Sequence, residues 1–358
     1  MKILLLLLTT VSFLMSSFAQ ETGKINTMII PQPQEIKIGN SYFSFKSNTK
    51  IIFNNEVLSQ QASIFSENIE RILGVKIITL DSHDDKSETG VLFLNIFKYS
   101  LNLGDEGYHL KVEKNKIIIE ANTIAGTYYG LQSLFQLVLL NADLQSYSIF
   151  EIKIPTLEIN DSPRFAYRGM HLDVGRHMFP PKFIKKYIDL LTYYKFNTFH
   201  WHLTEDQGWR IEIKKYPNAT VMSWRGTDGG IAAAQQGHDA IMTPGSHCYF
   251  DHYQSDKREN EPLAIGGFTS LEKVYSYEPI PELLNSDEAK YILGSQGNVW
   301  TEYMETPEHV EYMILPRMAA LSEVNWASEK NWELFKNKIN EQFLIYDRLG
   351  FNYCDHPY

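Results

Sequence analysis

The order of apolar and polar residues divides the chain into two parts, with the change near residue 155. In the first part, short apolar runs alternate with two stretches of helical spacing, which predicts a small α+β domain. Its expected strands are 43–45, 50–53, 91–96, 108–112 and 116–120, and its expected helices are 60–73 and 124–140. Residues 154–163 contain the turn formers Pro155, Asp161, Ser162 and Pro163, so they are expected to be a linker.

The second part opens with a strand, a helix and another strand. Residues 167–174 form an apolar run. Pro180 and Pro181 then stand where a helix would begin, because the first helical turn leaves its N–H groups unpaired anyway. Apolar residues recur at helical spacing as far as Tyr194, and residues 196–203 again have the pattern of a strand. A helix that joins two parallel strands makes a right-handed crossover.

Polar side chains follow both strands, and in a β/α barrel the carboxyl ends of the strands form the active face. Further strands are expected at 219–224, 239–243 and 291–300, and further helices at 231–236, 308–321 and 332–349. A complete barrel has eight strands and about 250 residues, more than residues 164–358 supply. We therefore expect an α/β fold, an incomplete (β/α)8 TIM barrel preceded by a small α+β domain. The polar residues in question are Asp173, Arg176, His177, His200, His202, Glu205, Asp206 and Trp209.

Charge and composition narrow the class of partner. The formal net charge of −10 disfavours a nucleic-acid partner, because phosphate binding needs a basic surface. Aromatic residues make up 13% of the chain, which suits flat ligands such as sugars and equally suits a large core.

Residues 1–19 have the features of a secretory signal, namely Lys2, an apolar run and the small-x-small sequence Ser17-Phe18-Ala19. The protein is therefore expected to be secreted or periplasmic. This run is short for a membrane span, and no other segment is expected to cross a membrane. Cys248 and Cys354 are expected to be free thiols, with one disulfide as the alternative.

Four blocks in the second part carry a specific resemblance. They are YRGMHLDVGRH at 167–177, NTFHWHLTEDQGWRIEIKKYP at 197–217, VMSWRG at 221–226 and LGSQGNVWTEY at 293–303. Together with GTYYGLQSLFQL at 126–137, they resemble glycoside hydrolase family 20, the β-N-acetylhexosaminidases. After the expected signal peptide over 1–19, the resemblance implies an accessory domain over 20–155 and a partial TIM-barrel catalytic domain over 156–358.

The sequence also departs from that family. The family's catalytic Asp-Glu dipeptide, in an H-x-G-G-D-E motif on the fourth barrel strand, has no counterpart, and neither has the W-D/E strand that follows it. Pro217 runs directly into Asn218, where strands three to five would stand. Asp228-Gly229-Gly230 has the wrong order for the motif, and Asp287-Glu288 precedes a strand rather than ending one. No catalytic residue is therefore assigned.

Seven positions match the family's sugar-binding residues. The planar guanidinium of Arg168 would donate hydrogen bonds to the C3 and C4 hydroxyls of the sugar. The alternative role for Arg168 is an ion pair at a strand end inside the barrel. Trp224 and Trp300 would enclose the acetamido group and stack on the pyranose, although a tryptophan at a strand end is more often part of a core. The others are Asp206 beside Glu205 in the acidic loop, Tyr249 for the acetamido oxygen, Asp251 for the outer hydroxyls and Glu302 on the C4 side.

The resemblance implies hydrolysis of terminal N-acetylhexosamine from glycans by a substrate-assisted retaining mechanism, with no cofactor and no metal. Without the Asp-Glu pair, this chain is expected to be inactive. The alternatives are a non-catalytic sugar-binding protein and an unstable deletion product with open strand edges. A metallohydrolase that uses His200 and His202 is a further rival. It would need more ligands at later strand ends, which are Trp224, Thr243 and Trp300.

Overall fold

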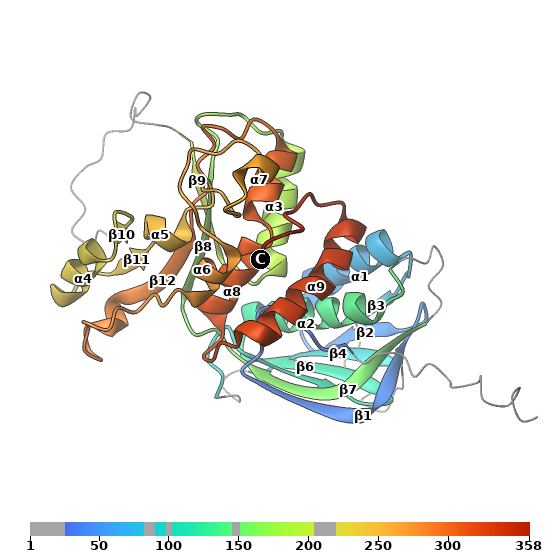
Figure 1. The fold of residues 1–358 in the computed structure, drawn as a ribbon. Helices are drawn as coiled ribbons and strands as arrows, with labels where there is room; N and C mark the ends of the chain where they lie inside the picture. Colours follow the sequence, from blue (N-terminus) through green and yellow to red (C-terminus); the bar gives the residue numbers. More distant parts are fainter. Residues whose placement is uncertain (1–25, 82–89, 98–101, 145–150, 204–219) are drawn as a thin grey trace, which may run out of the picture.

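The computed structural model describes residues 26–81, 90–97, 102–144, 151–203 and 220–358, which form two domains (Figure 1). The first is a seven-stranded mixed sheet in the order β1-β7-β5-β6-β4-β2-β3, with two helices over one face. Its elements are β1 (Glu35–Phe45), β2 (Lys50–Phe53), α1 (Ser59–Leu73), β3 (Ile78–Asp81), β4 (Val91–Ile96), β5 (Tyr108–Val112), β6 (Lys116–Ala121), α2 (Ile124–Asn141) and β7 (Ile152–Asp161).

Strand alternation and a capped helix build this domain. In β5 every second side chain is buried. These side chains point toward α2, which covers that face of the sheet. The Thr123 hydroxyl caps α2 by accepting a hydrogen bond from the Gly126 N–H at 3.3 Å. α2 is buried along most of its length, because the sheet covers one side of it while α1 and the last helix cover the other.

The linker predicted over residues 154–163 is wrong. These residues lie largely in β7, which pairs with both β1 and β5 in the first sheet. Pro155 has no N–H to give to a neighbour, and proline is tolerated in a sheet at bulges. Its partner here is Tyr42, which directly follows an irregularity in β1 between Ile38 and Tyr42. Pro155, which in the sequence indicates the end of a strand, therefore lies inside a strand and opposite a bulge.

The second domain contains a five-stranded parallel sheet in the order β10-β11-β12-β8-β9. Within the described residues, β9 and β10 stand at its two ends, so the sheet is a curled part of a barrel (Figure 1). The expected α/β fold with an incomplete barrel is confirmed. The strands are β8 (Tyr167–Asp173), β9 (Thr198–His202), β10 (Val221–Ser223), β11 (Ala240–Met242) and β12 (Ile292–Gly297).

The second domain also contains helices. They are α3 (Pro181–Tyr193), α4 (Asp228–Gln235), α5 (Gly245–Cys248), α6 (Leu271–Ser276), α7 (Pro307–Ile314), α8 (Arg317–Trp326) and α9 (Trp332–Leu349). The single helix predicted over 308–321 is wrong, because Pro316 cannot donate the hydrogen bond that a continuous helix needs there. The chain instead breaks between α7 and α8. The Tyr312 carbonyl, which would have accepted that bond, accepts one from the Gln254 side-chain amide, and the Leu315 carbonyl at the end of α7 accepts the Cys354 N–H at 3.2 Å.

A buried ion pair joins the two domains. Asp161, at the end of β7, accepts hydrogen bonds from the Tyr108 hydroxyl at 2.6 Å, the Lys195 ammonium at 3.1 Å and the Trp326 indole N–H at 2.9 Å. The Lys195 and Asp161 side chains are both 0% exposed. A buried charge without its partner is costly, so this cluster fixes the barrel domain against the first sheet.

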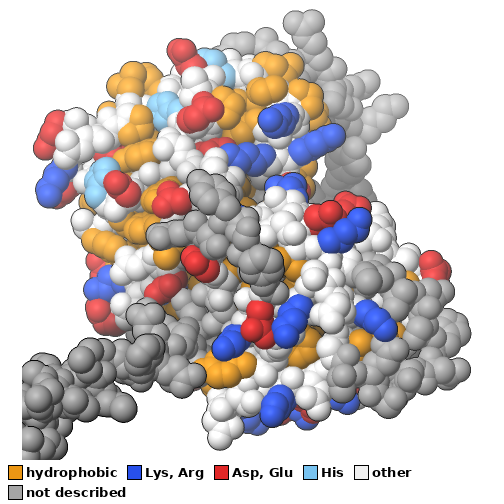
Figure 2. Space-filling view, turned by 90° about the vertical axis from the view of Figure 1, so that its right-hand side faces the viewer, with side chains coloured by type: hydrophobic (Ala, Val, Ile, Leu, Met, Phe, Trp, Pro, Cys, Tyr) orange, Lys and Arg blue, Asp and Glu red, His pale blue; other side chains and the backbone are white. Residues whose placement is uncertain are grey.

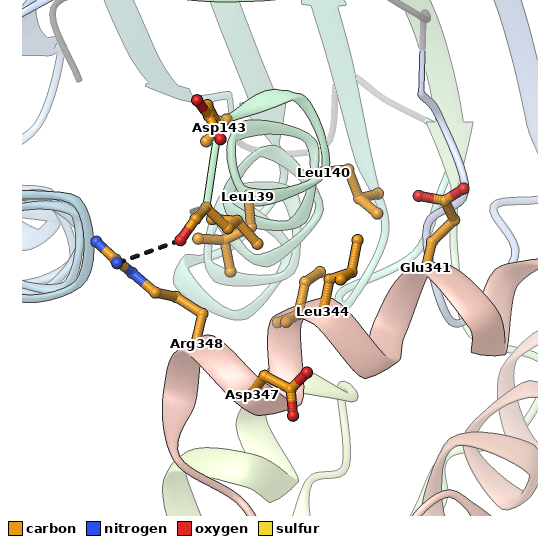
Figure 3. Close-up of a pocket in the computed structure, with 10 residues that line it drawn as sticks. Leu139, Leu140, Asp143, Glu341, Leu344, Asp347 and Arg348 are labelled. Atoms are coloured by element: carbon orange, nitrogen blue, oxygen red, sulfur yellow. Dashed lines mark hydrogen bonds between the residues drawn. The ribbon is translucent and has the colours of Figure 1, made fainter. Parts of the chain in front are cut away.

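The last helix also returns to the first domain. Arg348 of α9 donates hydrogen bonds to the carbonyl oxygens of Ile72 at 2.8 Å and Leu144 at 3.3 Å. A cavity of ≈ 560 Å³ lies between α2 and α9, lined among others by Leu139 and Leu344 (Figure 3). None of its lining residues comes from the five-stranded sheet.

The surface and the thiols complete the description. Among the described residues, no helix combines the length and apolar character that a bilayer span requires. On the face seen in Figure 2, acidic and basic side chains are interspersed over both domains. Cys248 and Cys354 are both free and buried, which confirms the expected thiols.

Candidate functional site

Asp173 organises the carboxyl end of the parallel sheet. It ends β8 and its side chain is 0% exposed. One carboxylate oxygen accepts the Gly175 N–H at 2.8 Å, and the other accepts the Arg176 guanidinium at 3.1 Å and the Thr301 N–H at 3.3 Å. The loop after β8 is therefore fastened to the loop after β12, and Arg176 is held in a fixed position.

Arg176, Trp300 and Glu302 form the centre of the site. The Arg176 guanidinium carbon lies 5.0 Å from the Trp300 ring centroid, and its Nη2 lies 3.4 Å from Glu302 Oε1. The Arg176 side chain is 26% exposed, so this end of the group is open to solvent. A planar cation over an aromatic face, with a carboxylate beside it, offers both donors and acceptors to a polyhydroxyl ligand.

Tyr249 and Asp251 enter the same group from the segment after α5. The Tyr249 side chain hydrogen-bonds to the side chains of Trp300 and Asn298, and burial is the main reason that its pKa is raised. Asp251 is buried, and burial together with the nearby Glu302 charge raises its pKa to about 7. A carboxyl of this kind is half protonated at neutral pH, so it can either donate or accept a hydrogen bond.

Two acceptor atoms in this group lack a donor. Asp251 Oδ1 and Glu302 Oε2 are buried, and neither has a hydrogen-bond partner among the described residues. Buried polar atoms are nearly always paired in folded proteins, so each exception calls for an explanation. Hydroxyl groups of a ligand placed against Trp300 would supply donors to both.

The other predicted residues lie at the rim or outside the described part of the chain. Trp224 directly follows β10 and is 49% exposed, with the Arg225 guanidinium 4.7 Å from its ring. The backbone of Trp224 is linked to the segment that carries Tyr249, because the Gly245 N–H donates a hydrogen bond to the Trp224 carbonyl oxygen at 3.0 Å. A Cβ added at Gly245 would lie 3.8 Å from the Tyr249 ring. Asp206 falls among residues 204–219, outside the described residues.

The structure places Arg168 away from this group. It stands at the amino end of β8, and its five N–H bonds go to Glu106 twice, Tyr129, and the carbonyl oxygens of Phe165 and Lys195. Its side chain is only 2% exposed. The structure therefore favours the alternative of an ion pair at a strand end, here across the domain boundary to Glu106, and no donor is left for a sugar hydroxyl.

Sequence reasoning gave Arg176 no sugar-binding role, although it named Arg176 among the polar residues after the first strand. The available signal was the position of Arg176 beyond the carboxyl end of β8, on the face where barrel sites form. His177 has a supporting role, because its Nδ1 hydrogen-bonds to the Thr301 carbonyl oxygen at 2.6 Å.

Three histidines border the site beneath Trp300. The ring of His171 lies 4.8 Å from that of His200, 5.3 Å from that of His202 and 4.5 Å from that of Trp300. Burial and the neighbouring histidines lower the pKa of His171, so this ring is neutral.

The candidate ligand atoms of these three rings lie within 4.8 Å of one another, which is close enough to hold a metal. However, His171 Nδ1 accepts the Val299 N–H at 3.3 Å, so in the neutral ring the proton is on Nε2. That proton occupies the position that a metal would need, which disfavours the metallohydrolase alternative.

Comparisons with known proteins agree with the geometry. The model of "Glycosyl hydrolase family 20, catalytic domain" matches residues 165–220 and 217–329, and "Glycosyl hydrolase family 20, domain 2" matches residues 26–162. The fold is similar to the GH20 exo beta-N-acetylglucosaminidase from Vibrio harveyi, solved in complex with N-acetylglucosamine. The TM-score is 0.79 at 19% identity, over 92% of this chain and 78% of that one.

Two curated relatives give the same result. The beta-hexosaminidase of Porphyromonas gingivalis is 26% identical over 500 residues, covering 91% of this chain and 64% of that protein. The beta-hexosaminidase of Vibrio furnissii is 34% identical over 208 residues, covering 58% of this chain and 31% of that protein. The chain thus spans less than two thirds of the length of either relative. Because the two family models together match most of the sequence, the chain belongs to glycosyl hydrolase family 20.

Proposed function

We propose that this chain binds the terminal N-acetylhexosamine of a glycan at the carboxyl ends of β8, β11 and β12, and that it does not hydrolyse the glycosidic bond. The observation that carries the binding proposal is the pair of unsatisfied acceptors, Asp251 Oδ1 and Glu302 Oε2, beside the Trp300 face. A pyranose has an apolar face that stacks on indole and a ring of hydroxyl donors, so it matches both features.

The sequence supports the absence of turnover. The dipeptide Asp-Glu occurs in it twice, at 105–106 and 287–288. Glu106 lies in the first domain and is bound to Arg168, while the Asp287 side chain is 86% exposed and pairs with Lys290. Neither carboxyl pair belongs to the strand ends that form the site.

The comparisons are consistent with a segment that this chain lacks. The catalytic-domain model matches two separate stretches that meet at residues 217–220, the junction where strands three to five would stand. The alignment with the Porphyromonas gingivalis relative extends over 500 positions, although this chain has 358 residues. The relative therefore carries residues inside the matched region that have no counterpart here.

One observation favours a second candidate, slow hydrolysis with Asp251 as the proton donor. A general acid works best when its pKa lies near the working pH, and the pKa of Asp251 is raised to about 7. Under this candidate, Asp251→Asn abolishes a low but measurable turnover. Under the main proposal, turnover of an aryl N-acetylglucosaminide is at background level before and after the substitution.

The test measures binding and turnover on the same preparations. Calorimetry with N-acetylglucosamine and N-acetylgalactosamine should show binding, with glucose as the ligand control. Trp300→Ala should weaken binding by about tenfold or more, because an aromatic contact contributes up to about 1.5 kcal/mol. Without the indole ring, the sugar hydroxyls are also no longer held against the two acceptor atoms.

The control variant is Trp201→Ala. Trp201 is 49% exposed and stacks on Phe199, on the opposite face of β9 from His200 and His202. Its loss should leave affinity unchanged. Sugar binding that is absent in a folded wild-type chain refutes the binding proposal, and turnover equal to that of an intact relative refutes the proposal of inactivity. A wild-type chain that is largely unfolded at 25 °C would instead support the deletion-product alternative.

The location of the protein is a separate proposal. Residues 1–19 lie outside the described residues, and their signal-like sequence supports export to the periplasm or the medium. Amino-terminal sequencing of the cell-derived protein should find a start at residue 20.

A further inference from the structure

A second polar cluster lies outside the proposed sugar site, where the end of the chain meets the segment that follows Asp251. It consists of Glu261, Cys354 and His356, whose candidate ligand atoms lie within 4.8 Å of one another. The hydroxyl of Tyr312, from α7, hydrogen-bonds to Glu261 Oε1 at 2.9 Å and also to the Cys354 side chain. The cluster therefore combines three segments that are far apart in the sequence.

The orientation of His356 suits a metal ligand. Its Nδ1 lies 2.8 Å from the Asp355 carboxylate, an acceptor only, so Nδ1 carries the proton and donates. In the neutral ring, Nε2 then has a lone pair, and it lies 3.3 Å from Glu261 Oε1. The contact between these two atoms is satisfied by a proton on Nε2, which makes an ion pair, or by a metal ion that both atoms bind. Metal-bound histidines usually have this carboxylate partner on their other nitrogen.

The spacing of the atoms fits tetrahedral coordination. With zinc–ligand distances of about 2.0–2.3 Å, the corners of a regular tetrahedron lie about 3.3–3.8 Å apart. Here His356 Nε2 lies 3.3 Å from Glu261 Oε1 and 3.5 Å from the Tyr312 hydroxyl, which match these edges, while the hydroxyl lies 2.9 Å from Glu261 Oε1, a hydrogen-bond distance shorter than an edge. The hydroxyl thus stands at the fourth corner, next to the thiol, the imidazole and the carboxylate.

Burial and charge favour an ion of charge +2. The Glu261 side chain and Cys354 are both 0% exposed, so a carboxylate and a thiolate would be costly here without a cation. The buried Arg317 guanidinium already acts on both groups, and one Zn²⁺ bound directly to them would add to this positive charge. The ligand set of one thiolate, one imidazole and one carboxylate oxygen is of the kind that zinc accepts.

An entry path to the cluster exists. The His356 side chain is 39% exposed, and His356 lines a hollow of ≈ 420 Å³ together with Gln254 and Trp332. The Gln254 N–H donates to the other oxygen of Glu261 at 3.2 Å, which holds the carboxylate in place.

We propose that Glu261, Cys354 and His356 form a zinc site, with the Tyr312 hydroxyl at the fourth position. The site fastens the end of the chain to the segment that carries Tyr249 and Asp251. Its role is structural, because the hydroxyl of Tyr312 occupies the position that a catalytic zinc keeps for water or substrate. This inference does not depend on the proposed sugar binding.

The experiment measures zinc on the full chain. After dialysis against micromolar Zn²⁺ and then metal-free buffer, elemental analysis should find one zinc per chain. Competition with a chromophoric chelator should show affinity lowered by more than about 100-fold in Cys354→Ser and His356→Gln. Asp355→Asn should lower it by about 10- to 100-fold, the range for residues that orient a ligand. Replacement of zinc by Co²⁺ should produce a thiolate–cobalt absorption band that Cys354→Ser removes.

Matched controls make the assignment specific. Cys248→Ser removes the other buried free thiol, and His200→Gln disrupts the histidine cluster beneath Trp300, so both should retain zinc and the cobalt band. His356 is partly exposed, so its glutamine variant should fold even if the serine variant does not. Wild-type protein that binds no zinc overturns the proposal, as does zinc lost with His200→Gln and kept in both Cys354→Ser and His356→Gln.

Discussion

Arg168 and Arg176 belong to the same sequence block, and the structure predicts different consequences for sugar binding when each is replaced. Arg168→Gln removes a guanidinium whose five N–H groups are all bonded in a side chain that is 2% exposed. Its acidic partner Glu106 is 25% exposed and has a lowered pKa, because the bonds and charge of Arg168 outweigh the opposing effect of burial. Both members of the ion pair are therefore largely removed from water, and it is their ionised forms that stabilise the fold.

The expected cost follows from this burial. Breaking a buried ion pair by removing one partner costs about 3–5 kcal/mol, and the partial exposure of Glu106 places the expected value near 3 kcal/mol. Urea unfolding followed by tryptophan fluorescence should show this loss. The folded variant should bind N-acetylglucosamine as the wild type does, because no atom of Arg168 faces the site.

Arg176→Gln is the matched variant, with the same chemical change at the other end of β8. Its side chain is 26% exposed, but its partner Asp173 is 0% exposed, so we expect a loss of stability near 3 kcal/mol, similar to that of Arg168→Gln, together with the loss of sugar binding. If Arg168→Gln abolished binding at unchanged stability while Arg176→Gln left binding intact, the assignment of the two arginines would be reversed.

Three further outcomes are expected. The pKa of Asp251 is raised from 3.8 to about 7, so the folded state binds this proton more tightly than the unfolded state does. Stability should therefore fall by on the order of 4 kcal/mol as the pH rises from about 4 to about 7, and Asp251→Asn should flatten the dependence of Tm on pH in that window. A Tm profile that Asp251→Asn does not change would contradict the shift. Asp161→Asn leaves Lys195 buried without its carboxylate and should cost about 3–5 kcal/mol in urea unfolding, whereas a loss below about 1 kcal/mol would argue against the buried pair. Gly294→Ala places a Cβ 2.0 Å from a backbone oxygen at φ +145, so the yield of folded protein should collapse, while Gly74→Ala, at φ +70 with nothing within 4 Å, should cost only about 1 kcal/mol.

Local sequence patterns were sufficient for most of the strands and helices. β2, β4 and β5 have the predicted bounds, because each apolar run is delimited by turn-forming or polar residues. Two errors are at prolines, since Pro155 is accommodated opposite a bulge and Pro316 divides one predicted helix into two, and the short elements β3 and α6 were not predicted. Whether a proline interrupts an element depends on its neighbours in space, which the sequence alone does not give.

The grouping of residues in the candidate site was predictable in part, and their sugar-binding role stays a prediction. The blocks indicated Tyr249, Asp251, Trp300 and Glu302, and the structure brings them into one group. Arg168 was misplaced because a motif match does not tell which end of a strand a residue occupies. At about 3.3 Å per residue, Arg168 lies roughly 16 Å from Asp173 along β8, at the wrong end for a barrel site. The raised pKa of Asp251 results first from burial and in smaller part from the charge of Glu302, and both arise from segments that are distant in the sequence.

The position of α9 has a consequence for how the protein is made. α9 is the last helix of the sequence, yet it covers α2 of the first domain, and Asn26 near the start of the described chain donates to Glu341 on α9 at 2.8 Å. During synthesis the amino-terminal half therefore leaves the ribosome with an apolar helical face still open to solvent. That face closes only after α9 has been synthesised, so the nascent chain depends on a late contact and stays exposed to aggregation until then.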